Sequence, residues 1–495
     1  MNARILSILL LSLTGTEAKA TRAKTVQVTG LPAEYSAWPG HPAEPAGRLF
    51  TTLSCPALTR LNLKKGVSEP YLLRSLEESA GEGADWIHKL QLRRGLKWWN
   101  GDKITADHLR EWIKDNLDIL VARSGNGLWQ VPPFQVENAG HGVLIRYRQK
   151  PVFGPWILND HAFFRESDSG NWQCAGPYAI TDQPGVLQLA RTGKRKTWPG
   201  KLIFATEGTP TPAGVHELSF GWASHFATSP WTRWPDRRAN CATAVDLPLI
   251  TLIHWNPASP YGGNSAIRKA VTHASPRGAF LRAGAGYLGD LLSGPVLRAH
   301  PGYNRKVLVR NYDPNKADQI LNKLDYKVSG KRGLRMMPDG GDMLLRFGVM
   351  GRSTGLMEKV LSDHFAALGV NARFSGKYSA AEADGILGGL WLPWPNGNLI
   401  SLFHSGATPG AAPYQLSHKK LDRQLEAYAI SLTRQKPEFS QLRKIHRTLY
   451  DLEAVSIMLQ HRACLIKGAP AIAKVDTRDP DWFMRLLVKK GRLRI

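Results

Sequence analysis

The stretch at residues 86–109, WIHKLQLRRGLKWWNGDKITADHL, contains the signs of a strand, a turn and a helix in that order. Residues 88–94 alternate polar and apolar side chains, which predicts a strand. Residues 95–102 predict a second strand that ends in a tight turn. Thr105 is a good N-cap, and apolar side chains follow it at helical spacing, which predicts a helix. The apolar face of this helix consists of Leu109, Trp112, Ile113, Leu117 and Leu120.

Further strand patterns occur on both sides of this stretch, at residues 25–28, 143–148, 201–206 and 250–255. Residues 49–65 have apolar side chains at helical spacing. Strands and helices therefore alternate without a fixed repeat length, which predicts α/β lobes. A length of 495 residues exceeds what one hydrophobic core usually serves, so we expect more than one domain.

The second half of the chain is richer in helix signals. Asp313 and Pro314 form a favourable N-cap and N1 pair for a helix. A helix at residues 354–368 is predicted to end before Gly369, which suits the C′ position. Ser417 is the predicted N-cap of a further helix.

The first twenty residues predict a signal peptide. Arg4 provides the positive charge, residues 5–13 (ILSILLLSL) form an apolar run too short to span a bilayer, and Ala18 and Ala20 occupy the −3 and −1 positions. Cleavage is therefore expected after Ala20, with a mature chain that is periplasmic or extracellular. The junction contains no cysteine, so a lipid anchor is not expected there.

The formal net charge is +25, from 65 Lys and Arg against 40 Asp and Glu. Nucleic-acid binding is the usual first interpretation of such a charge. Here the basic residues are spread along the chain, and the longest runs are as short as Lys194-Arg195-Lys196. We therefore expect no nucleic-acid partner and favour attraction to anionic membranes or cell-wall polymers, or an effect on solubility.

The four cysteines, Cys55, Cys174, Cys241 and Cys464, show no CxxC spacing, so a metal site or thioredoxin-type chemistry is not predicted. In an oxidising compartment, one or two disulfides are expected, and all three pairings remain open. No GxSxG, HExxH, P-loop or GxGxxG motif is present in a suitable context, so we predict no enzymatic activity, no cofactor and no metal.

Residues 86–109 resemble the most recognisable stretch of the family 5 extracellular solute-binding proteins, which are the oligopeptide, dipeptide and nickel binders of ABC importers. The family pattern is W…F-x-L-R-x-G-V-x-F-H-x-G-x-x-x-T-A-x-D-V, and Trp86 followed by residues 90–109 matches it almost step by step. Weaker matches follow in the family's order. They lie at residues 53–60, 176–178, 267–274, 312–317 and 368–370.

This resemblance implies an α/β, two-lobed periplasmic-binding-protein-like fold of type II with an extra subdomain, joined by a hinge. Lobe I would comprise residues 21–48, 169–255 and 460–495, with a subdomain at 49–168 attached to it, and lobe II would comprise residues 256–459. The implied function is to capture a peptide or other small solute between the lobes for import through ABC permease subunits. Members of this family are usually monomeric, and we expect a monomer.

In peptide-binding members, an Asp in a D-Y-x-D-P-x-N segment holds the ammonium group of the ligand. The matching segment here is residues 391–398, WLPWPNGN, in which Pro393 falls at the position of that Asp and Asn396 replaces the second one. Because a buried ammonium group without a carboxylate is costly, we expect a neutral or anionic ligand, or an amine held by another acid. A one-residue shift of the alignment, or a displaced acid such as Asp384, is the alternative.

The predicted ligand-binding residues come from this segment and from the loop after the first strand. We expect Trp391 and Trp394 to stack on the ligand or to fill the cleft wall. The two asparagines of the segment would form uncharged hydrogen bonds with the ligand. The residues are Trp391, Trp394, Asn396, Asn398, Tyr35 and Trp38. Two other functions remain open: a ligand-sensing module related to regulators that contain such lobes, and an exported enzyme with a dispersed site.

Overall fold

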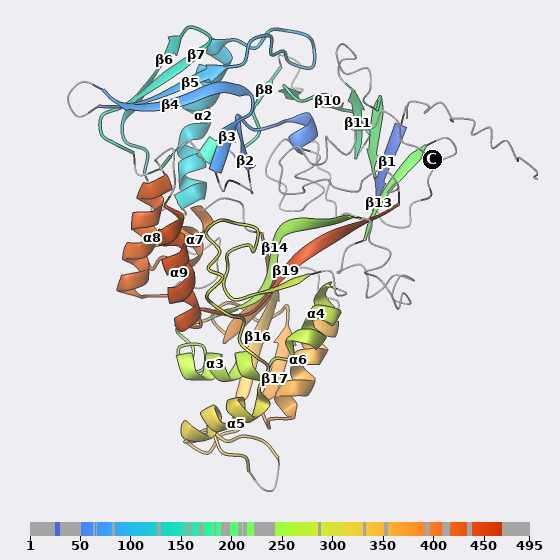
Figure 1. The fold of residues 1–495 in the computed structure, drawn as a ribbon, viewed down its shortest axis with the longest axis vertical. Coiled ribbons are helices and arrows are strands. Elements are labelled where there is room, and N and C mark those ends of the chain that lie inside the picture. Colours follow the sequence, from blue (N-terminus) through green and yellow to red (C-terminus); the bar gives the residue numbers. More distant parts are fainter. Residues whose placement is uncertain are drawn as a thin grey trace, which may run out of the picture.

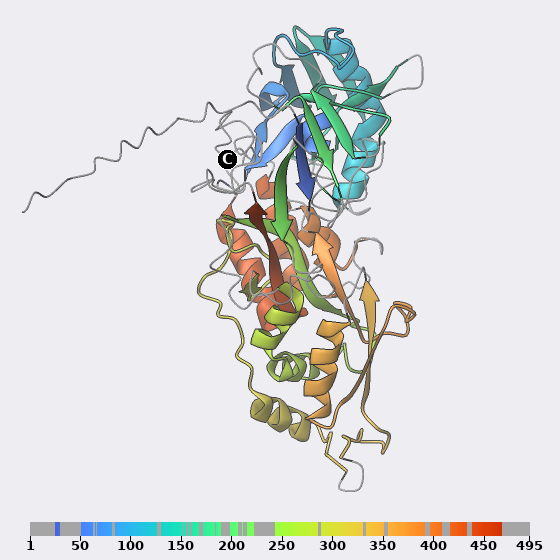
Figure 2. The same ribbon diagram turned by 90° about the vertical axis from the view of Figure 1, so that its right-hand side faces the viewer.

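The computed structural model describes residues 25–29, 51–62, 65, 67–81, 85–125, 130–151, 153–154, 157–158, 161–167, 172–183, 185–189, 199–205, 210, 215–221, 243–285, 289–329, 333–350, 355–391, 397–407, 416–432 and 438–467. The predicted signal peptide lies outside these residues. Mixed strands and helices form two lobes, one above the other in Figures 1 and 2.

One sheet runs through both lobes. Among the described residues it has eleven strands, of which ten lie in a continuous order and β15 (Asp290–Leu292) pairs with β19 beside that path. The ten strands in order are β10 (Tyr178–Ile180), β11 (Val186–Leu189), β12 (Lys201–Phe204), β1 (Thr25–Thr29), β13 (His216–Gly221), β19 (Val455–Lys467), β14 (Thr243–Trp255), β18 (Gly385–Trp391), β16 (Leu344–Met350) and β17 (Asn371–Ser375). The strands predicted at 25–28, 201–206 and 250–255 are confirmed.

Strands β14 and β19 are the two long strands in the middle of this order, and Figure 2 shows both running from one lobe into the other. The register between them shifts between Asp246 and Ile250. Pro248 lies in this interval, and it has no backbone N–H to donate to the neighbouring strand. The β14–β18 ladder begins directly afterwards, at Leu249. The break at Pro248 therefore separates the part of β14 that pairs with β19 alone from the part that pairs with both neighbours.

A second, antiparallel sheet forms the subdomain at the top of Figure 1. Its order is β4 (Leu73–Ala80), β5 (Trp86–Leu92), β7 (Gly142–Tyr147) and β6 (Phe134–Ala139), and helix α2 (Ala106–Gly125) contacts β6 and β7. The strands predicted at 88–94 and 143–148 and the helix after Thr105 are confirmed, and the Thr105 hydroxyl accepts a hydrogen bond from the backbone N–H of His108. Short strand pairs also form between β2 (Thr59–Asn62) and β3 (Val67–Pro70) and between β8 (Phe164–Glu166) and β9 (Trp172–Cys174).

Two of the predicted strands and helices are wrong. Residues 95–102 form a looped turn with an isolated bridge between Lys97 and Lys103 in place of a second strand. The helix expected at 49–65 is a single turn at 51–54. Pro56 cannot supply the N–H that a continuing helix needs, and the chain enters β2 three residues later.

Helices cover both faces of the lower part of the sheet. Helices α3 (Ser265–Ala274), α4 (Arg277–Ala285) and α6 (Leu356–Ala366) share a buried cluster with Ile253 and Trp255 of β14. Helices α7 (Gly397–Phe403), α8 (Lys419–Leu432) and α9 (Phe439–Asp451) share another cluster with Ile250 and Leu252. Because alternate residues of a strand face opposite sides, these clusters lie on the two faces of the sheet.

The helix ends in this half largely follow the sequence. Helix α5 (Pro314–Lys323) begins after Asp313, whose side chain accepts a hydrogen bond from the N–H of Lys316. Gly369 has a positive φ of 73° after α6, as the C′ position requires. The N-cap predicted at Ser417 is wrong by one residue, because α8 begins after His418, whose Nδ1 accepts from the N–H of Leu421.

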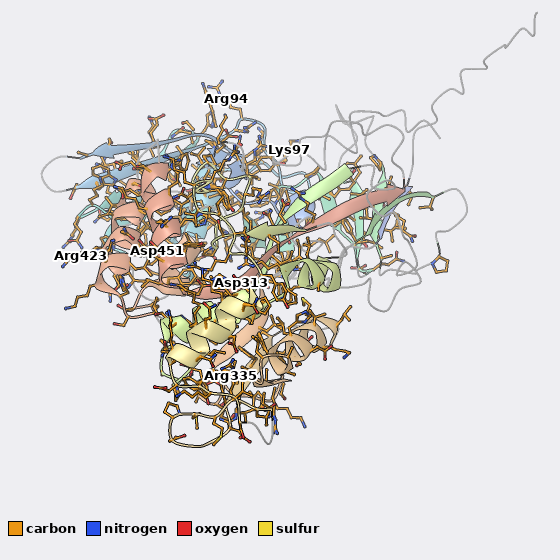
Figure 3. The ribbon with its side chains drawn as sticks, turned by 60° about the horizontal axis from the view of Figure 1, so that its bottom comes forward. Arg94, Lys97, Asp313, Arg335, Arg423 and Asp451 are labelled. Atoms are coloured by element: carbon orange, nitrogen blue, oxygen red, sulfur yellow. A yellow bond between two sulfur atoms is a disulfide. The ribbon has the colours of Figure 1, made fainter. Side chains whose placement is uncertain are left out.

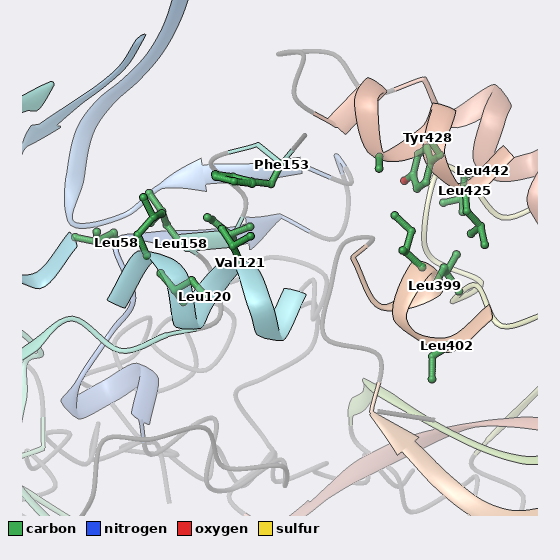
Figure 4. Packing of buried hydrophobic residues seen from close by; sticks show 14 of the residues in the cluster. Leu58, Leu120, Val121, Phe153, Leu158, Leu399, Leu402, Leu425, Tyr428 and Leu442 are labelled. Atoms are coloured by element: carbon green, nitrogen blue, oxygen red, sulfur yellow. The ribbon is translucent and has the colours of Figure 1, made fainter. Parts of the chain in front are cut away.

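The second cluster also extends into the subdomain. It contains Leu120 and Val121 of α2 together with Leu399 of α7 and Leu425 of α8, and Figure 4 shows these two groups of side chains. Segments separated by almost 300 residues in the sequence therefore contribute to one core. The boundaries predicted for the lobes stay a prediction.

Cys55 and Cys174 form a disulfide with a Cα–Cα distance of 4.9 Å. This fixes one pair from the open possibilities, while Cys241 and the side chain of Cys464 lie outside the described residues. None of the helices in the described part of the chain has the length and apolarity that a membrane crossing requires.

Candidate ligand site at the junction of the lobes

The C-terminal end of β18 lies where the two lobes meet. Trp391 is paired with Leu249 of β14, and the next residue of β14, Ile250, is paired with Gln460 of β19. This is the level at which β14 pairs with β19 again after Pro248. The backbone of Trp391 therefore lies beside the two strands that connect the lobes.

Helix α7, the next described element after Trp391, packs close to the same level of β14. Residues 392–396, which include Pro393, Trp394 and Asn396, lie outside the described residues. The chain is described again at Gly397, the first residue of α7, and Leu399 and Ile400 are buried in the same cluster as Ile250. Of the predicted site residues, the structure therefore brings the backbones of Trp391 and Asn398 to the junction, and their side chains are not described. Tyr35 and Trp38 lie outside the described residues.

Asp384, the alternative acid, lies at the other end of β18. Seven residues of extended strand separate it from Trp391, which corresponds to about 23 Å. Its carboxylate accepts a hydrogen bond from the backbone N–H of Arg346 at 2.7 Å, and its backbone carbonyl accepts from the N–H of Asn256. Burial raises the pKa of Asp384. This carboxylate lines a cavity of about 790 Å³ with Asn256, Ser259, Arg346, Tyr378 and Glu382.

The connecting strands also contain buried polar residues that sequence reasoning missed. Thr251 Oγ1 and His461 Nε2 are 2.7 Å apart, which ties β14 to β19. Trp255 donates from its indole N–H to the Ser456 hydroxyl at 2.7 Å. The sequence does indicate buried polar residues in this strand, because a threonine and a histidine interrupt the apolar run at residues 249–255 (LITLIHW).

The histidines on these strands are neutral at pH 7. Burial lowers the pKa of His254 and of His461 to about 4. The ring of His254 contacts that of Phe403 on α7 edge-on, with centroids 5.8 Å apart. This contact helps to fix the position of α7 relative to β14.

Numerous solved structures have a similar fold. NikA from Brucella suis in complex with Fe(III)-EDTA aligns with a TM-score of 0.70 at 15% identity, covering 92% of this chain and 98% of that one. NikZ from Campylobacter jejuni in complex with Ni(L-His) aligns with a TM-score of 0.68 at 15% identity, covering 90% and 94%. The oligopeptide-binding protein AppA from Bacillus subtilis in complex with a nonapeptide aligns with a TM-score of 0.64 at 14% identity, covering 93% and 99%.

The fold is that of the two-lobed solute-binding proteins. The predicted fold class is thereby confirmed. No family model matches the sequence, and no curated protein matches it significantly.

Within this solute-binding fold, a buried Ser–His pair raises the question of catalysis. Ser293 Oγ and His446 Nε2 are 3.2 Å apart, and both residues are buried. The backbone N–H of Asn304 donates to His446 Nδ1 at 3.1 Å, so in the neutral ring Nε2 carries the proton and donates to Ser293. Burial lowers the pKa of His446 to about 4, which keeps the ring neutral. His446 therefore has no free nitrogen with which to remove a proton from Ser293.

A metal site needs several His, Cys, Asp or Glu side chains close together. In the described segments, no three His, Cys, Asp or Glu side chains are grouped so that they could hold a metal ion. A metal-containing solute would therefore need ligands from the remaining residues or from a small chelating molecule bound with it.

Proposed function

We propose that this protein is the exported substrate-binding component of an ABC importer, which holds a small solute between its lobes and delivers it to a permease pair. The observation that supports this most strongly is the two-lobed solute-binding fold, in which β14 and β19 are the long strands that connect the lobes. Only a few connecting strands need to bend for such lobes to close on a ligand.

The proposed division of the chain follows the sequence resemblance. Lobe I comprises residues 21–48, 169–255 and 460–495, the subdomain residues 49–168, and lobe II residues 256–459. The mature protein begins after Ala20, acts as a monomer outside the cytoplasm and catalyses no reaction. The protonated Nε2 of His446 supports the absence of serine hydrolase chemistry at Ser293.

The proposed ligand is a small solute whose recognition does not depend on a free amino group. Pro393 and Asn396 stand where peptide binders have carboxylates, and Asp384 lies about 23 Å from Trp391 along β18. Trp391 and Trp394 would stack on the ligand, and Asn396 and Asn398 would form uncharged hydrogen bonds.

Thermal unfolding of the mature chain (residues 21–495) against free peptides, N-blocked peptides, sugars and chelated nickel tests this proposal. A ligand at 100 times its dissociation constant should add about 2.7 kcal/mol to the free energy of unfolding. We expect stabilisation by at least one compound without a free amino group, and its loss in Trp391→Ala and Trp394→Ala. Trp172→Ala, on strand β9 outside the junction, is the matched control and should retain it.

Two outcomes contradict the proposal. Stabilisation by free-amine peptides alone would show that another acid binds the ammonium group. Turnover of a bound compound would make the protein an enzyme.

A further inference from the structure

A large basic groove lies on the surface of lobe II, at helices α8 and α9. Its volume is about 970 Å³, which is in the range of small-molecule binding sites. One wall is formed by the loop at residues 299–306 and the other by helices α8 and α9. The lining residues are Ala299, His300, Pro301, Tyr303, Asn304, Arg305, Lys306, Lys420, Gln424, Arg443, Lys444, Arg447 and Thr448.

The lining is far more basic than the chain as a whole. Six of these thirteen residues are Lys or Arg and none is Asp or Glu, whereas 65 of the 495 residues in the chain are Lys or Arg. Like charges gathered around one recess repel each other and destabilise the folded state. A bound anion would offset this repulsion.

Most of these cations have no counter-ion among the described residues. Arg447 pairs with Asp451 at 3.1 Å, and Arg443 donates to the carbonyl of Pro301 at 2.8 Å. Figure 3 labels Asp451, at the end of α9. The other four, Arg305, Lys306, Lys420 and Lys444, form no ion pair with any residue that the structure describes.

The floor of the groove is held by hydrogen bonds before any ligand arrives. The backbone N–H of Asn304 donates to His446, and its side-chain amide donates to the carbonyl of Arg443 at 3.1 Å. These bonds hold the loop against α9 without a ligand.

We propose that this groove binds a ligand that carries more than one phosphate group. Several cations around a recess of this size match several negative charges, whereas a single chloride or carboxylate would leave most of them unpaired. Each phosphate group offers several strong acceptor oxygens and keeps its charge at neutral pH. The site would account for part of the +25 net charge, and it shares no residue with the proposed solute site.

The test uses the mature protein and inorganic tripolyphosphate, with binding measured by calorimetry at constant ionic strength. The triple variant Lys306→Glu/Lys420→Glu/Lys444→Glu should weaken binding at least tenfold. The matched control, Lys97→Glu/Lys103→Glu/Lys377→Glu, changes the net charge equally at exposed positions outside the groove and should change binding less than threefold. Circular dichroism and thermal unfolding verify that both variants fold.

Vesicle sedimentation distinguishes the sources of the phosphate. If vesicles with cardiolipin, whose headgroup carries two phosphate groups, bind the protein through the groove, phosphatidylcholine vesicles do not, and tripolyphosphate competes, the natural ligand is a lipid headgroup. If tripolyphosphate binds and the vesicles do not, the ligand is soluble. Both results support the proposal. Equal loss of binding in the two triple variants, no binding of either probe, or groove-dependent binding of duplex DNA in preference to tripolyphosphate would overturn it.

Discussion

Arg310 donates from Nε to the carboxylate oxygen Oε2 of Glu453 at 2.6 Å, directly before the connecting strand β19 begins. Both side chains are buried or nearly so, with 14% and 5% exposure. Arg310 also donates to the carbonyl of Tyr450, and Arg268 donates to the backbone carbonyl of Glu453 at 2.9 Å. Glu453 has a positive φ of 48°, a conformation that non-glycine residues seldom adopt. These contacts therefore fix how the chain turns from α9 into β19.

Replacing Glu453 by Gln should destabilise the protein strongly. The change leaves the buried guanidinium of Arg310 without a negative partner, which costs about 3–5 kcal/mol. Urea unfolding monitored by tryptophan fluorescence measures the change. Asp363→Asn removes the partner of Lys359 in the exposed pair at 2.9 Å and should cost less than about 1 kcal/mol. Equal effects of the two substitutions would show that the Arg310–Glu453 pair has no special role.

Glu78 should make the subdomain less stable as the pH rises. Burial raises its pKa from 4.5 to about 7, and burial lowers the pKa of the neighbouring His88 to about 4. Their 3.8 Å contact is therefore no ion pair near pH 7, since His88 is neutral there. The folded state binds the Glu78 proton more tightly than the unfolded state does. The contribution of Glu78 to the free energy of unfolding is therefore full below pH 4.5 and is lost as the pH rises through 7.

Glu78→Gln tests this relation. The substitution should remove the loss of stability between pH 5 and 8, and it should raise the free energy of unfolding at pH 8 by about 1–3 kcal/mol. Urea unfolding at pH 5, 7 and 8 measures both effects, with the exposed Glu77→Gln as the control. An unchanged pH profile in Glu78→Gln would contradict the assignment.

Buried histidines should make the protein unstable in acid. Burial lowers the pKa of His254, His446 and His461 from 6.5 to about 4. Their contribution to stability is present above pH 6.5, where both states are neutral, and is lost as the pH falls toward 4, because the unfolded chain binds protons first. Each contributes up to about 3 kcal/mol, which exceeds the opposing effect of Glu78 when summed.

Urea midpoints at pH 7.0, 5.5 and 4.5 should decline steadily. The urea midpoint of His461→Gln should decline less steeply with falling pH than that of the parent, since the glutamine side chain does not titrate. The exposed His141→Gln is the matched control and should follow the parent. A midpoint that stays constant from pH 7.0 to 4.5 would show that these rings are accessible to water.

Loss of the Cys55–Cys174 disulfide should lower stability by about 2–5 kcal/mol, because the bond closes a long loop of the unfolded chain. The bond spans 119 residues of sequence, and both cysteines are fully buried. Calorimetric unfolding of Cys55→Ser/Cys174→Ser measures the loss. Peptide mapping under non-reducing conditions provides an independent check, and a free Cys55 thiol in the parent would contradict the pairing.

The sequence by itself determined the local elements and, through the order of its motifs, the fold. Thr105, Asp313 and Gly369 mark helix ends because a cap forms hydrogen bonds with backbone groups only a few residues away. Hydrophobic periodicity predicted the wrong structure where a single residue prevented the element from forming. Pro56 did so in the helix expected at 49–65.

The tertiary structure alone decided which distant residues meet. It paired Cys55 with Cys174 and placed Arg310 against Glu453. It also assembled the basic groove from a loop and from two helices that follow this loop by more than 100 residues in the chain. The physical reason is that hydrophobic periodicity states which face of an element is buried. The partner of that face depends on strand order and helix packing, which no local pattern contains.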